Sequence, residues 1–479
     1  MTSFATTPGA DVEPGVQTTA AALARWACEL QPRQADLDLA DIALIDTVAV
    51  ALAATGHPLL AVTAGLPEPA RWAAQAHVVD YDDLHLPSTT HISTVCVPAA
   101  AAVGGDARAY LAGAGVMARI GSALGWNHYS RGWHATSTTA PMAAAVVAAT
   151  ARGFSAEDTA RAMALAVSSA GGVQRAFGSD AKAIQVGLAV EAGIRAADLV
   201  AHGASADPRV LDAWLALVSE PPFDLALDSA EAVPGGLAVK VYPCCYALQR
   251  PIACTSELAA GLDSAQVERI DVWVTESAIQ PLVHHRPASG LEAKFCLEHA
   301  VAVAVTDRVP GFDSFSDAAV RRPEVARLTR SVTVHVAPGG NGLLEDEVRV
   351  ALTTTDGREL TGSIDIPPGR PAGRSPGINW RRRYVTVPAT MPMPYWRPAG
   401  ATSPAYSGVR PPRRHRRMLH DRPDRTGRRG TRRRRPCRGG GARRGGALVA
   451  QRGGNDYRCR RHHRDRHRRR GDAAQRCPG

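Results

Sequence analysis

Apolar residues recur at three- and four-residue intervals through the first half of the chain, a spacing typical of helices that bury one face. Residues 142–152 form one such run, rich in alanine and valine. Ser155 and Asp158 have the spacing of a capping box and predict a helix over residues 156–169. A third run covers residues 182–202, so the pattern predicts helices throughout this part.

The spacing changes to a period of two after Pro243. Apolar residues alternate with polar ones over residues 270–274, 332–336 and 348–352, which predicts strands with one buried face. The Asp356-Gly357 pair stands between two threonine-containing segments and is typical of a hairpin turn.

Two helical stretches, at residues 293–305 and 317–329, lie between these strands and give this part a mixed α+β character. We therefore expect a mainly α protein with three parts. A large all-helical domain covers residues 1–235, a smaller α+β domain covers 236–370, and a disordered basic tail covers 371–479.

The composition of the tail differs abruptly from that of the rest. Residues 371–479 contain 31 arginines and five aspartates but no lysine or glutamate, whereas the remaining residues carry a net charge of −15. The tail also has few large apolar side chains. Burying them cannot offset the conformational entropy that the segment would lose on ordering, so we expect it to be disordered. The tail fits a nucleic-acid-binding segment, a solvated appendage or the product of a shifted reading frame. We favour the last, because aromatic residues for base stacking are sparse.

Nine cysteines are scattered along the chain without a disulfide framework, which suits a reducing, cytoplasmic location. The N-terminal residues lack the apolar core of a signal peptide. Stretches such as residues 140–151 are shorter than the roughly 20 apolar residues that span a bilayer, so we expect no membrane segment. Cys459, His462 and His463 have a metal-ligand spacing, but the arginines around them would repel a cation.

Lysine is scarce: the chain has 53 arginines and only Lys182, Lys240 and Lys294. A lysine is a compact charge on a flexible stem, and burial can shift its pKa. Lys182 stands at the start of a predicted helix, where the helix dipole disfavours a cation unless it faces an anion. Lys240 lies where the two domains meet, a common place for ligand sites. We expect both to be functional, and Lys294 to be structural because Glu292 can offset its charge.

Residues 80–91 contain three aspartates and two histidines, His85 and His91, just before an apolar run. Crowded carboxylates raise one another's pKa, and a neighbouring histidine can then exchange protons near neutral pH. An aspartate-rich turn capped by histidines would look the same. The segment is therefore a candidate either for acid–base chemistry or for turn formation.

A glycine-containing loop around Arg131 and His134 precedes a predicted helix whose first turn carries hydroxyl groups. Free N–H groups at that helix start would bind an anion together with these two side chains, unless Thr136 or Ser137 simply caps the helix. Cys244 and Cys245 are adjacent, so they fit small buried thiols better than a redox pair.

These motifs resemble the MmgE/PrpD family, which includes 2-methylcitrate dehydratase, cis-aconitate decarboxylase and iminodisuccinate epimerase. The resemblance extends from about Ala40 to Ile366. Its motifs occur in the family's order, at residues 44–50, 80–83, 91–93, 132–137, 177–182, 240–244 and 292–295.

The resemblance implies an all-α domain carrying most of the site, an α+β lid, a homodimer, and catalysis without a metal or organic cofactor. By this resemblance, the expected catalytic residues are Asp80, His91, His134, Lys182 and Lys240. The substrate-binding candidates beside them are Arg131, His85 and Cys245. In the family, C-terminal helices return to the helical domain, whereas here the arginine-rich tail takes that place.

The expected function is removal of water from a small di- or tricarboxylate, as in 2-methylcitrate dehydratase. His91 or Asp80 would take the proton next to a carboxylate, and His134 would assist loss of the hydroxyl group. Epimerisation or decarboxylation of a related acid stays an alternative, although Leu84 and Cys245 replace a threonine and a histidine found in family members. Outside this class, the chain could be an impaired relative or a non-specific nucleic-acid binder through its tail.

Overall fold

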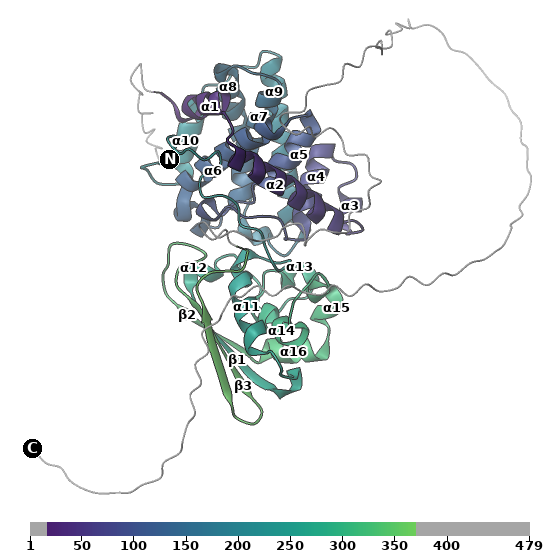
Figure 1. The fold of residues 1–479 in the computed structure, drawn as a ribbon. Coiled ribbons are helices and arrows are strands. Elements are labelled where there is room, and N and C mark those ends of the chain that lie inside the picture. Colours follow the sequence, from purple (N-terminus) through teal and green to yellow (C-terminus); the bar gives the residue numbers. More distant parts are fainter. Residues whose placement is uncertain (1–16, 370–479) are drawn as a thin grey trace, which may run out of the picture. The chain divides into compact units, whose positions relative to one another are not determined.

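The computed structural model describes residues 17–369, and the first part of this range is built of helices (Figure 1). The basic tail predicted over 371–479 lies outside the described residues. The helices of this part are α1 (Thr19–Glu29), α2 (Gln34–Ala53), α3 (Leu59–Val62), α4 (Glu68–Val78), α5 (Ser93–Val103), α6 (Ala107–Ser130), α7 (Ala135–Ala151), α8 (Ala156–Ala166), α9 (Asp180–Ala201) and α10 (Arg209–Val218).

Helix α7 forms the core of this helical part, because every residue from Ala135 to Ala149 is buried. Its neighbours approach closely through small residues. A Cβ added to Gly113 of α6 would lie 2.3 Å from Val147 Cγ2, and one added to Gly193 of α9 would lie 2.2 Å from the Pro141 carbonyl oxygen. Only glycine fits such contacts without displacing a neighbour, and interiors this dense have little room for displacement.

The start of α8 follows the capping signal in the sequence. Ser155 is the N-cap, and its hydroxyl oxygen accepts a hydrogen bond from the Asp158 N–H at 3.1 Å. The helical run predicted over residues 156–169 continues beyond α8 as a short 3₁₀ turn, Val167–Ser169. The helix predicted over 182–202 is also present, as α9.

A single sheet follows in the second part of the described chain (Figure 1). Its strands are β1 (Val267–Thr275), β2 (Val332–Ala337), β3 (Val348–Thr354) and β4 (Glu359–Ile364), in the order β2-β1-β3-β4. Strand β1 pairs in parallel with β2 and antiparallel with β3. The predicted hairpin turn joins β3 to β4, and Gly357 supplies the positive φ of +82° that this turn requires.

The helices of this part are shorter than the sequence pattern predicts. They are α11 (Gln249–Leu258), α12 (Glu276–Ile279), α13 (Gly290–Ala293), α14 (Leu297–Asp307), α15 (Asp317–Val320) and α16 (Pro323–Arg330). The single helices predicted over 293–305 and 317–329 are therefore wrong in detail. Pro323 explains the second break, because proline disfavours helical geometry at the preceding residue, and Arg322 is extended with ψ of 126°.

The sheet and these helices share one apolar core, built largely from alternating strand residues and from α14. The buried Arg250 of α11 ties loops to this core by donating to the carbonyl oxygens of Leu343, Leu344, Asp346 and Asp365. The mainly α fold class is confirmed, with the sheet as its one β component among residues 17–369. Within that range, no helix combines the length and apolar character needed to cross a bilayer.

Candidate active site

Five side chains predicted to be catalytic are buried, and they come from four separate segments of chain. Asp80 and His91 flank the loop between α4 and α5, and His134 is the N-cap of α7. Lys182 lies in the first turn of α9, and Lys240 lies in the extended segment before α11. Direct contacts join Asp80 to both lysines, and ring contacts join both histidines to a further residue, His77.

Asp80 binds both lysine ammonium groups. Its Oδ1 atom accepts from Lys182 Nζ at 2.8 Å and from Lys240 Nζ at 3.2 Å, and its backbone oxygen accepts from Lys240 Nζ at 2.9 Å. Burial alone would raise the pKa of Asp80, but the two ammonium groups outweigh it and hold that pKa well below its usual range. Asp80 is therefore ionised, and it is a poor base at neutral pH.

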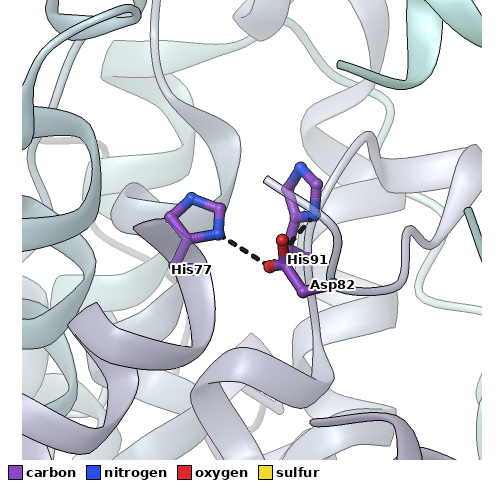
Figure 2. A group of neighbouring side chains, drawn as sticks. All are labelled: His77, Asp82 and His91. Atoms are coloured by element: carbon purple, nitrogen blue, oxygen red, sulfur yellow. Dashed lines mark hydrogen bonds and ion pairs between the residues drawn. The ribbon is translucent and has the colours of Figure 1, made fainter. Parts of the chain in front are cut away.

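Asp82 accepts hydrogen bonds from two imidazoles. Its Oδ2 atom lies 2.7 Å from His77 Nδ1 and 3.3 Å from His91 Nδ1. Figure 2 marks both contacts with dashed lines. His91 Nδ1 also lies 2.7 Å from the Asp83 carbonyl oxygen. Both acceptors are oxygens without hydrogen, so Nδ1 of His91 carries its proton and Nε2 holds the lone pair.

His91 is therefore prepared to act as a base. Burial lowers its pKa and outweighs the opposing effect of Asp82, so the ring is neutral at pH 7. Within residues 17–369, no hydrogen bond reaches His91 Nε2. A neutral imidazole with an unoccupied lone pair is the form that accepts a proton from a substrate.

His134 carries its proton on the other ring nitrogen, Nε2. The Gln185 side chain accepts from the Val173 N–H through Oε1, which directs its amide nitrogen at His134 Nδ1. Nδ1 must then be the acceptor, so Nε2 carries the proton. Burial, together with the Lys182 charge, holds the pKa of His134 well below its usual value. Nε2 is buried and has no partner within the described range, so it offers an unused hydrogen-bond donor.

The three predicted substrate-binding residues lie in different settings. His85 is buried, but its ring nitrogens are bonded to Ser88 Oγ at 2.6 Å and to the Pro234 carbonyl oxygen at 2.7 Å. Arg131 is half exposed and pairs with Glu220 at 2.7 Å. Among the described residues, no hydrogen bond or ion pair joins either of them to Asp80 or to the lysines.

Cys245 is closer to the cluster. Burial, reinforced by Asp80, raises the pKa of its thiol to about 12, so it is a neutral thiol and an unreactive nucleophile. Its backbone N–H donates to the Lys294 carbonyl oxygen at 3.1 Å. The Lys294 ammonium group donates to the Pro243 carbonyl oxygen at 2.6 Å, and burial lowers its pKa to about 8.

His77 and Gln185 were not singled out by the sequence analysis. His77 Nε2 lies 2.8 Å from Lys182 Nζ, although the two residues are 105 positions apart. The sequence signal for His77 is weak: a histidine in the last turn of α4, shortly before the aspartate-rich run. Nothing in the sequence near Gln185 marks its role, because that role depends on the orientation of one amide group.

His77, Asp82 and His91 could hold a metal ion by the closeness of their donor atoms, which lie within 4.8 Å of one another (Figure 2). The spacing of these atoms is that of a hydrogen bond between a donor and an acceptor, and it suits a shared proton better than a divalent cation. His77 Nδ1 and Asp82 Oδ2 are at hydrogen-bond distance, 2.7 Å, and the Lys182 ammonium group touches the other side of His77. A dication placed here would displace that proton and face a fixed positive charge.

Comparison with known proteins gives matches to two family domains. The MmgE/PrpD N-terminal domain matches residues 69–219, and the MmgE/PrpD C-terminal domain matches residues 242–376. The first match includes Asp80, His91, His134 and Lys182, and the second begins two residues after Lys240. No curated protein matches the chain. The two matches cover more than half of the sequence and support an enzyme of the lyase or dehydratase type: the chain belongs to the MmgE/PrpD family.

Proposed function

We propose that this protein is a cofactor-independent lyase that removes water from a small hydroxylated di- or tricarboxylate, in the manner of 2-methylcitrate dehydratase. The observation that carries the proposal is the pair of buried histidines with opposite proton placement. His91 presents a lone pair at Nε2, and His134 presents an N–H at Nε2. Elimination of water needs one group of each kind.

The lysines support an anionic substrate. Lys182 and Lys240 bring two ammonium groups to a single carboxylate, Asp80, and all three side chains are nearly or fully buried. One oxygen of that carboxylate, Oδ2, is buried and has no hydrogen-bond partner among the described residues. A substrate carboxylate could therefore share the two cations, while a substrate hydroxyl could donate to Asp80 Oδ2.

The reaction follows from these placements. His91 Nε2 takes a proton from the carbon next to a substrate carboxylate, and the lysines stabilise the enolate-like charge that develops. As the carbon–carbon double bond forms, the bond between the β-carbon and its hydroxyl breaks, with His134 Nε2–H bonded to the departing oxygen. The proton taken by His91 passes to that oxygen, so water leaves and both histidines return to their starting states.

Epimerisation uses the same two groups but returns the proton to carbon, and decarboxylation breaks a carbon–carbon bond instead. A panel of acids separates these reactions. We expect 2-methylcitrate or citrate to yield an unsaturated product detectable by ultraviolet absorbance, with iminodisuccinate and cis-aconitate as the tests of the two alternatives.

The variants His91→Gln and His134→Gln test the assignment. Each should lower kcat/KM by roughly 100-fold or more, the usual scale of acid–base catalysis. The matched control is His299→Gln, since His299 is equally buried on α14 and donates to the Ser314 carbonyl oxygen. Full activity in His91→Gln, or no reaction with any acid by a folded wild-type protein, would refute the proposal.

A further inference from the structure

His77 takes no part in the reaction proposed above, yet it is fully buried between Asp82 and Lys182. We infer that His77, oriented by Asp82, is a positioning residue that sets the direction of the Lys182 ammonium group toward the substrate. This inference rests on the proposed function for the identity of the ligand, a small polycarboxylate. The contact itself can be tested without any substrate.

The proton placement on His77 follows from its two neighbours. Asp82 is ionised, because His77 and His91 outweigh the effect of burial and hold the pKa of its carboxyl well below the usual range. A carboxylate can only accept, so His77 Nδ1 donates to it across 2.7 Å. Nε2 is then the acceptor for Lys182 Nζ at 2.8 Å, since an ammonium group can only donate.

The alternative, a proton relay from Lys182 through His77 to Asp82, is disfavoured. Burial lowers the pKa of His77 to about 4, and the Lys182 charge contributes to this effect. An imidazole with this pKa does not take a proton from an ammonium group at neutral pH. His77 therefore acts as a fixed acceptor and takes no proton from Lys182.

Two fixed bonds determine the third. An ammonium group has three N–H bonds. Two of those of Lys182 are directed at His77 Nε2 and Asp80 Oδ1, so one N–H bond is left for another acceptor. A free lysine ammonium rotates on a flexible stem and has no preferred direction. With two donors held, the remaining N–H points in one direction, as a carboxylate-binding group requires.

The small number of lysines makes this contact directly observable. Protein labelled with ¹³C and ¹⁵N in lysine alone gives three side-chain signals, which Lys→Arg substitutions assign to residues 182, 240 and 294. We expect His77→Leu to move the Lys182 signal of the substrate-free protein and to speed exchange of its ammonium protons. His77→Gln should move it less, because the glutamine oxygen can still accept a hydrogen bond. His299→Gln should leave it unchanged.

Kinetics test the consequence for the substrate. With the acid that the wild-type protein turns over, His77→Leu should raise KM by about 10- to 100-fold, the range for loss of a hydrogen bond to a charged group. His77→Gln should recover most of that loss. His299→Gln should lower thermal stability without changing KM, so a purely structural role of His77 would give the same result as this control.

The outcomes separate the two proposals. If no acid is turned over, the proposed function fails while the lysine spectra still decide the role of His77. If His77→Leu does not fold, His77→Gln and Asp82→Asn remain, and both should shift the Lys182 signal. A Lys182 signal that stays identical to that of the wild type in every folded variant of this set would overturn the inference, as would a folded His77→Leu protein with unchanged KM.

Discussion

At the scale of single residues, Asp80 shows how the site stores strain. Its φ is +52°, in the left-handed region that aspartate tolerates better than most residues but that still costs free energy. In this conformation both its carboxylate and its backbone oxygen face Lys240. Removing either lysine would leave the buried negative charge of Asp80 only partly neutralised. The strained backbone at Asp80 and its two ion pairs are therefore retained together.

Lys294 gives a prediction for the pH dependence of stability. Burial lowers its pKa to about 8 in the folded protein, from 10.5 for an exposed lysine. Below pH 8 both states are protonated, and folding bears the full cost of the buried charge. Between pH 8 and 10.5 the folded state has lost a proton that the unfolded state retains, so stability rises with pH by at most about 1.4 kcal/mol per unit.

The measurement is the free energy of unfolding in urea between pH 7 and 10.5. Lys294→Met should remove this rise, and so should Lys294→Arg, because a guanidinium keeps its charge throughout this range. A wild-type profile parallel to that of Lys294→Met would show that Lys294 does not titrate in this window.

The sequence predicted most residues of the candidate site but not the contacts between them. Scarce lysines and clustered imidazoles pointed to Lys182, Lys240 and His91 because unusual residue types are visible in one dimension. The contact of His77 with Lys182, and the amide of Gln185 that fixes the proton on His134, depend on the fold bringing distant segments together. His85 belongs to the same aspartate-rich segment as His91, but the chain turns its ring toward Ser88 and Pro234.

At the scale of elements, close helix packing depends on glycines. Gly113→Ala places a methyl group 2.3 Å from Val147 Cγ2 and 2.9 Å from the Ala143 carbonyl oxygen. We expect a loss of about 1–3 kcal/mol in the free energy of unfolding, the usual cost of overpacking a core. The control is Gly65→Ala, where an added Cβ meets nothing within 4 Å. Equal urea midpoints for the two variants would contradict a tight α6–α7 contact.

The same scale explains which elements the sequence could predict. The alternating pattern is clearest in β3, where Val348, Val350 and Leu352 face the core. Strand β2 was also predicted, but the buried face expected for it is absent, because none of its residues is buried and Val336 is exposed. Breaks within helices were missed. The apolar spacing over 293–305 gives no sign that α13 ends at Ala293, and the contact of Lys294 with Pro243 at this point is a tertiary one.

At the scale of the whole molecule, charge divides the chain into two regions. The sequence as a whole carries +11, yet the part before residue 371 is acidic and the arginines concentrate after it. The site lies in the acidic part, where Lys182 and Lys240 are buried cations and most other charges are carboxylates. Under the proposed function, a polyanionic substrate would be held by these buried groups and not by the net charge of the surface.

The basic tail should act independently of that site. Because the attraction of its arginines to phosphates is electrostatic, we expect the full chain to bind single-stranded DNA with an affinity that falls steeply as salt rises. Deletion of residues 371–479 should abolish this binding and leave kcat/KM for the acid unchanged, measured by fluorescence anisotropy and by turnover. If the shortened chain keeps its fold by circular dichroism but loses turnover, then the segment after residue 370 contributes to catalysis, and a shifted reading frame is no longer an adequate account of it.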